Sequence, residues 1–119
     1  MNIYTGYYSK TKHYIDEGLF PIAISGKVPP FFKGLCWKQF APSWYIWRRW
    51  HDGEITNSEY VEEFRRDILG ILDIEEVRKE IEEIGKDIVL LCYESPEKFC
   101  HRHLVGEWIE NNLGIKVKE

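Results

Sequence analysis

A continuous apolar run at residues 87–93, DIVLLCY, is the sequence feature that most constrains the fold. Its five middle residues are all apolar, without the polar alternation of a strand that has one face in water. An unbroken run of this length is typical of a parallel strand that is covered on both faces. The run therefore predicts the buried strand of a mostly parallel sheet.

Further strands and helices alternate along the rest of the chain. Apolar segments within residues 2–9, 19–27 and 114–118 predict strands. The capping residues that predict helix starts are Ser43, Thr56 in TNSE, Asp73 in DIEE, and Ser95 followed by Pro96. The helix after Asp73 is expected to end at Gly85, and the last helix at about Asn112. This order predicts one α/β domain over residues 1–119, a mostly parallel β-sheet flanked by helices in Rossmann-like layers.

Charge and cysteine content indicate the compartment and the kind of partner. The net charge is −4, yet residues 1–53 carry seven basic and three acidic side chains, against nine and seventeen in residues 54–119. A basic, aromatic first half favours an anionic partner. Three cysteines in a chain with a normal core predict reduced thiols in a cytoplasmic protein. No apolar run resembles a signal peptide or could span a bilayer, so no membrane association is expected, and no cofactor is expected.

Residues with reactive side chains gather directly after the buried strand, in CYESPEKFCHRH at 92–103. On a helix of 100° per residue, His101 falls on the apolar face, with Cys100 and Arg102 at its two edges. His103 points to the opposite side. Parallel sheets bind ligands beyond the carboxyl ends of their strands, where the start of a helix also offers free backbone N–H groups. The segment therefore predicts a pocket at the strand end.

Three chemistries are open for this pocket. Cys100 could be a reactive thiol, with His101 as its base and Glu94 orienting the histidine. Arg102 and the helix amides could instead bind a phosphate-like anion. A metal ion could take Cys92, Cys100 and His101 as ligands. However, the C-x7-C-H spacing matches neither the closely spaced pairs of structural zinc nor a C-x-x-C redox pair, so no metal is expected. It also lacks the short Cys-to-Arg loop of a cysteine phosphatase.

Each of these residues also has a purely structural interpretation. Cys92 follows apolar residues and suits a small buried hydrophobe. His101 on an apolar face suits a hydrogen-bonded core histidine, and Arg102 could pair with Glu94 or Glu97. Because so many polar groups fall at one strand end, a functional pocket is the favoured interpretation.

The segment at 37–50, WKQFAPSWYIWRRW, mixes aromatic and basic side chains. Such a mixture can stack on the bases of single-stranded nucleic acid and neutralise its phosphates. The residues expected to do so are Trp44, Trp47, Arg48 and Arg49. Tryptophans of this kind more often fill a core, and they can also cover a neighbouring pocket.

The segment LLCYESPEKFCHRHLVGEW at 90–108, with looser matches in AISGKVPPFFKG, FAPSW and LGILDIEEV, carries a family resemblance. In these segments the chain resembles the domain of unknown function 488 family, small prokaryotic α/β proteins. The resemblance implies a compact α/β domain and no particular activity. The polar cluster that it implies is Cys92, Glu94, Cys100, His101 and Arg102. Many relatives carry Asp-x-Arg after the second strand, where this chain has Ser25-Gly26-Lys27, which leaves Lys27 as the substitute cation.

The sequence thus predicts a cytoplasmic protein that binds a small anionic ligand, phosphate- or nucleotide-like, in a strand-end pocket. Cys100 and His101 are the candidate catalytic residues. The candidate ligand-binding residues are Cys92, Glu94, Arg102 and Lys27. The alternative is a non-enzymatic module that binds nucleic acid or protein through residues 37–50.

Overall fold

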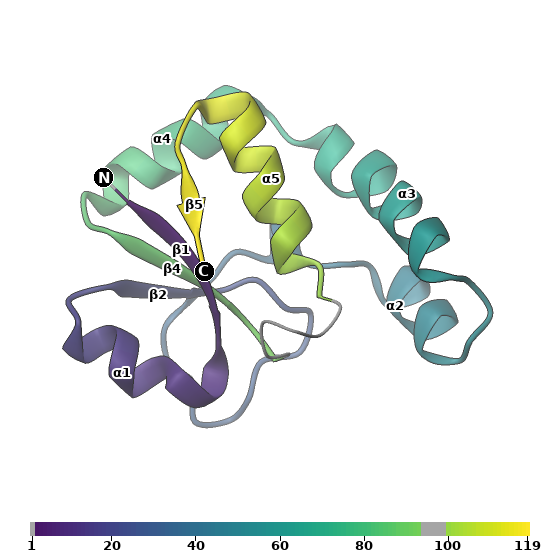
Figure 1. Ribbon diagram of the computed structural model, residues 1–119, viewed down its shortest axis with the longest axis horizontal. Coiled ribbons are helices and arrows are strands. Elements are labelled where there is room, and N and C mark those ends of the chain that lie inside the picture. The colour runs from purple at the N-terminus through teal and green to yellow at the C-terminus, as the bar shows by residue number, and fades with distance from the viewer. Residues whose placement is uncertain (1, 94–99) are drawn as a thin grey trace.

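A five-stranded parallel sheet forms the centre of the computed structural model, which describes residues 2–93 and 100–119 (Figure 1). Its strands are β1 (Ile3–Tyr7), β2 (Phe20–Ala23), β3 (Leu35–Cys36), β4 (Ile88–Cys92) and β5 (Val117–Lys118). They lie in the order β3-β2-β4-β1-β5, and every paired neighbour runs parallel. All five residues of β4 are buried, as the apolar run predicted, because this strand lies between β2 and β1. The α/β fold with a parallel sheet is therefore confirmed.

Helices cover both faces of this sheet, unequally. They are α1 (Thr11–Asp16), α2 (Trp44–His51), α3 (Asn57–Asp67), α4 (Ile74–Ile84) and α5 (Arg102–Leu113), with short 3-10 turns at Tyr8–Lys10, Lys38–Phe40 and Leu69–Ile71. The larger core packs Ile22, Ile88 and Leu90 of one sheet face against α3, α4 and α5. The opposite face packs Val89 and Leu91 against α1 and the loop that contains Phe32. None of the described helices is long and apolar enough to cross a membrane.

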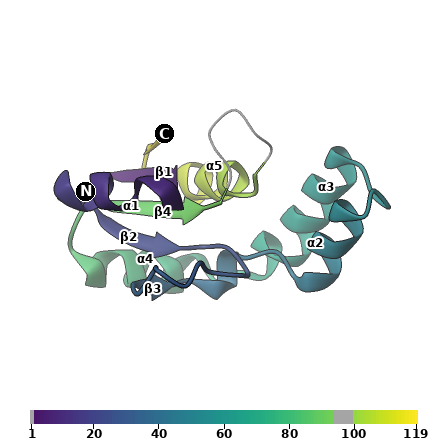
Figure 2. The ribbon, with the colours of Figure 1, turned by 90° about the horizontal axis from the view of Figure 1, so that it is seen from below.

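Helices α2 and α3 lie beyond the carboxyl ends of the strands, as Figure 2 shows. Their starts are fixed by the expected caps. The Ser43 side chain accepts a hydrogen bond from the Ile46 N–H at 3.1 Å, and Thr56 and Glu59 form a reciprocal capping box. A cap of this kind stabilises a helix by about 1 kcal/mol. The local sequence therefore determines where each helix of this projecting pair begins.

Helix α4 also begins and ends where the sequence predicted. The Asp73 carboxylate accepts hydrogen bonds from the N–H groups of Glu75 and Glu76. Gly85 closes the helix with φ of 65°, a left-handed conformation that glycine adopts without strain. This helix leads directly into the buried strand β4.

Two elements differ from expectation at the sequence level. Residues 11–16 form the exposed helix α1, where a loop was expected, and Leu35–Cys36 form a short edge strand. The last helix was expected to start at Ser95 and Pro96, which lie outside the described residues. Helix α5 begins at Arg102, so Cys100 and His101 precede its first turn. The 100° wheel therefore does not apply to them, because it requires helical backbone on both sides.

Candidate functional site at the strand ends

A pocket of about 750 Å³ lies at the carboxyl ends of β2 and β4 and is termed the strand-end pocket. The loop after β2 contributes Ser25, Gly26 and Lys27 to its lining. Helix α2, the segment before it and helix α3 contribute Pro42, Trp44, Trp47, Trp50 and Tyr60. The end of β4 and the start of α5 contribute Cys92, Tyr93, Cys100 and His101. Parallel α/β sheets bind ligands at this edge, so the pocket lies where a ligand is expected.

Cys92, Cys100 and His101 meet in this pocket and form the Cys–His cluster. Their two sulfurs lie 2.7 Å apart. Nδ1 of the histidine lies 3.7 Å from the Cys92 sulfur and 3.9 Å from the Cys100 sulfur. All three residues are buried, and neither cysteine forms a disulfide bond. The sequence brought these residue types near one another, and the fold brings their reactive atoms within 4.8 Å.

The orientation of the His101 ring is set by a backbone carbonyl. Its Nε2 lies 2.7 Å from the carbonyl oxygen of Ile24, which can only accept a hydrogen bond. Nε2 therefore donates to this carbonyl, and Nδ1 faces the two sulfurs. The ring also packs against Phe64, with centroids 5.5 Å apart. Nδ1 of His101 is thus held toward both cysteines.

The surroundings of Cys100 favour its thiolate. Its hydrogen bond with Cys92 lowers the pKa of the Cys100 thiol, burial opposes this effect, and His101 and the backbone N–H of Arg102 lower the pKa further. The Arg102 N–H belongs to the start of α5, where the helix dipole also favours negative charge. Of the two cysteines in the cluster, Cys100 has this contact with the start of the helix.

Arg102 lies apart from the pocket lining. Its side chain is fully buried, and Nη2 lies 3.3 Å from Oε1 of Glu119. Glu119 also accepts a hydrogen bond from the Thr5 hydroxyl on β1. The arginine therefore ties the start of α5 to the last residue of the chain. Arg102 was expected to bind a ligand near His101. A helical projection of the local sequence cannot reveal a contact with a carboxylate 17 positions away.

The other predicted ligand-binding residues are distributed as follows. Lys27 is exposed on the pocket lining, three residues after Ile24. Glu94 lies outside the described residues. Ser25 joins the lining with its hydroxyl 2.6 Å from the Tyr8 hydroxyl. Lys27 was expected in this loop as a cation, whereas no sequence signal distinguished Ser25.

The aromatic wall of the pocket consists of Trp44, Trp47 and Trp50 of helix α2. Trp44 is 70% exposed and Trp47 is 43% exposed. From the sequence these side chains were expected to fill a core, with a nucleic-acid surface or a cover over the neighbouring pocket as alternatives. Their spacing of three residues is a signal that they share one helix face, and the fold directs that face to the strand ends. The expectation that such tryptophans fill a core was therefore wrong for Trp44 and Trp47.

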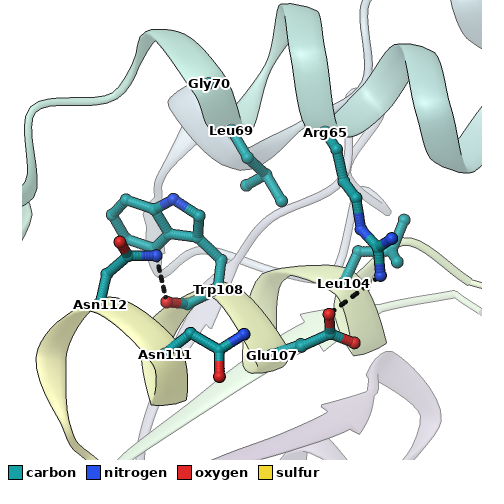
Figure 3. A pocket seen from close by; sticks show the side chains of 8 residues that line it. All are labelled: Arg65, Leu69, Gly70, Leu104, Glu107, Trp108, Asn111 and Asn112. Carbon is teal, nitrogen blue, oxygen red and sulfur yellow. Dashed lines mark hydrogen bonds and ion pairs between the residues drawn. The ribbon is translucent and has the colours of Figure 1, made fainter.

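A second pocket of about 350 Å³, the α3–α5 groove, lies between helix α3, the turn after it, and helix α5 (Figure 3). Arg65 reaches across it to Glu107 at 2.9 Å, and Asn112 donates a hydrogen bond to the Trp108 carbonyl. Its lining includes Leu69 and Leu104 but none of the described cysteines or histidines. The residues with reactive side chains are thus associated with the strand-end pocket.

A comparison with known families identifies the family of this chain. A family model described as the active DUF488-N3 subclade matches residues 31–113. The chain belongs to the DUF488 family. The matched residues include the aromatic wall and the Cys–His cluster, whereas the DUF488 model does not extend to Lys27. No match was found among curated proteins or among solved structures.

Three kinds of chemistry are compatible with the cluster in this DUF488 protein. A thiolate next to an oriented imidazole can act as a nucleophile. Two adjacent thiols can be oxidised to a disulfide. Two sulfurs and one imidazole nitrogen can bind a metal ion.

Proposed function

We propose that the strand-end pocket binds a small anionic ligand, phosphate- or nucleotide-like, and that Cys100 and His101 act on it. One observation carries this proposal: the Cys–His cluster, with its ring nitrogen oriented by Ile24, lies in the lining of a pocket beyond the strand ends. Buried reactive groups that converge on a concave site mark the default binding site of a protein. The α3–α5 groove has no such groups among its described lining residues.

The pocket lining supplies a role for each part of such a ligand. The Lys27 ammonium provides positive charge for the anionic group. The exposed faces of Trp44 and Trp47 provide a stacking surface for a planar ring. The Cys100 sulfur would face the bound molecule, with the His101 ring beside it in the same lining. Arg102 is left out of these contacts, because its guanidinium is buried against Glu119.

Isothermal titration of adenosine monophosphate and of inorganic phosphate into the protein tests this proposal. We expect binding of at least one probe, weakened about two- to fivefold in Lys27→Ala, because one charge contact of up to about 1 kcal/mol is lost. Lys33→Ala is the matched control, since Lys33 is an exposed lysine of the same loop that does not line the pocket. Absence of binding to both probes, or equal weakening in the two variants, would overturn the proposal.

A second candidate function is the binding of single-stranded nucleic acid by the aromatic segment. The exposure of Trp44 and Trp47 favours it. The pairing of both arginines with acidic side chains opposes it, because Arg49 contacts Glu63 at 2.7 Å and Arg48 contacts Asp52 at 3.7 Å. Oligonucleotide binding that weakens with salt would support this function. Absence of binding at low salt would remove it.

A further inference from the structure

We propose that the Cys–His cluster is a three-ligand zinc site whose fourth coordination position opens into the strand-end pocket. The ligands would be the sulfurs of Cys92 and Cys100 and Nδ1 of His101. Two thiolates and one imidazole form a donor set that suits zinc, and three protein ligands with an open fourth position are typical of catalytic zinc. The inference rests on the cluster alone and holds whether or not the pocket binds an anion.

The distances within the cluster are compatible with tetrahedral zinc after a small adjustment. Bond lengths of about 2.3 Å to sulfur and about 2.0 Å to nitrogen place a sulfur and a nitrogen about 3.5 Å apart, and two sulfurs about 3.7 Å apart. The sulfur–nitrogen distances of 3.7 and 3.9 Å are close to this geometry. The two sulfurs, at 2.7 Å, must separate by about 1 Å. A rotation of one cysteine side chain supplies a movement of this size.

The second hydrogen bond of the histidine has the form found in metal sites. A histidine that binds a metal through one ring nitrogen donates its other N–H to a carboxylate, a backbone carbonyl or a water. His101 donates Nε2–H to the Ile24 carbonyl, and the Ile24 N–H is itself bonded to the Leu91 carbonyl at 3.0 Å. The ligand orientation is therefore built into the sheet between β2 and β4. This contact serves a metal site without any movement of the ring.

The spacing of Cys92, Cys100 and His101 in the sequence argued against zinc, but that argument assumes that one short loop supplies the ligands. Closely spaced cysteine pairs are needed where one short loop must supply two ligands. Here Cys92 ends a strand and Cys100 precedes a helix, so separate elements of the sheet edge bring the sulfurs together. The cluster shares its pocket lining with Lys27 and the aromatic wall. An anion bound there would reach the free coordination position of the ion.

Metal analysis of the protein, produced in zinc-supplemented medium and freed of loose metal by dialysis, tests the inference. We expect about one zinc per chain, measured without added phosphate or nucleotide. Cys92→Ser and Cys100→Ser should each lower zinc affinity tenfold or more. Cys36→Ser is the matched control and should keep its zinc, because Cys36 lies on the edge strand β3 outside the cluster.

Cobalt substitution distinguishes metal ligands from merely structural cysteines. The wild-type protein loaded with cobalt should show thiolate-to-metal charge-transfer absorption and the visible bands of a tetrahedral site, and both should be lost in Cys100→Ser. No zinc and no such spectrum in wild type would overturn the inference. An intact mass that has lost two hydrogens, with no metal bound, would also overturn it by showing a Cys92–Cys100 disulfide. Probe binding with no zinc, or zinc with no probe binding, separates this inference from the anion proposal.

Discussion

The strand-end pocket, at the start of helix α5, and the α3–α5 groove, along its length, differ in what lies beneath them. The strand-end pocket rests on buried residues whose positions are fixed by backbone contacts, such as the His101–Ile24 hydrogen bond. The α3–α5 groove is bridged by Arg65 and Glu107, whose side chains are about half exposed. A concave surface alone therefore says little about function in this protein. The orientation of buried polar groups toward the cavity is the informative difference.

The largest expected effect is at the Cys–His cluster. Replacing His101 by Ala removes a buried ring and leaves the Ile24 carbonyl without that donor, so the free energy of unfolding should fall by about 3 kcal/mol. Urea denaturation of wild type and variant measures this loss. His103→Ala is the control, because its side chain is 43% exposed, and it should change stability by less than about 0.5 kcal/mol. Similar losses in both variants would contradict the account of a fixed cluster.

A smaller loss of stability is expected when the pH is raised, and it comes from Tyr8, which contacts the pocket residue Ser25. Burial raises the pKa of Tyr8, whose hydroxyl contacts Ser25, from 10.0 to about 12. The folded state then favours the neutral phenol, so this contribution to stability is complete below pH 10 and is lost between pH 10 and 12. The free energy of unfolding should fall by roughly 1 kcal/mol from this group by pH 11.

Urea denaturation at a series of pH values measures this fall, with Tyr8→Phe as the comparison. The variant should show a shallower decline above pH 10. Some decline should remain, because burial also raises the pKa of Tyr60 in the same pocket. An identical decline in wild type and Tyr8→Phe would show that Tyr8 does not contribute.

The smallest effect is expected in the α3–α5 groove. The Arg65–Glu107 ion pair is 2.9 Å long, but its side chains are 51% and 54% exposed. Exposed pairs contribute about 0.2 to 1 kcal/mol, so Arg65→Ala should lower stability by less than about 1 kcal/mol. It should leave zinc content and probe binding unchanged. A loss as large as that of His101→Ala would show that the two regions do not differ as described.

The sequence predicted the sheet and the helix starts because these depend on local signals. The apolar run of β4, the Ser43 cap and the Thr56 capping box each act within a few residues, and each lies where expected. The capping residue Asp73 and the left-handed Gly85 likewise define helix α4. Interactions of this range can be recognised in one sequence without knowledge of the fold.

The site was predicted in part, because its contacts span the chain. The clustering of Cys92, Cys100 and His101 at a strand end was apparent from their order along the chain. The Ile24 carbonyl that orients the histidine is 77 positions from it along the chain. The aromatic wall belongs to α2, which α3 and α4 separate from β4 in the sequence. Arg102 was expected at the ligand and instead pairs with Glu119, since the edge strand β5 brings the last residue to the start of α5. Such contacts arise from tertiary packing.

Tryptophan side chains offer a direct measurement of which pocket is the functional one. Trp44, Trp47 and Trp50 line the strand-end pocket, whereas Trp108 lines the α3–α5 groove. Titrating adenosine monophosphate into nitrogen-15-labelled protein and following the indole N–H signals reports on both pockets in one experiment. The account predicts that the signals of Trp44 and Trp47 shift while that of Trp108 stays in place. A shift of Trp108 alone, or no shift of any indole signal, would contradict it.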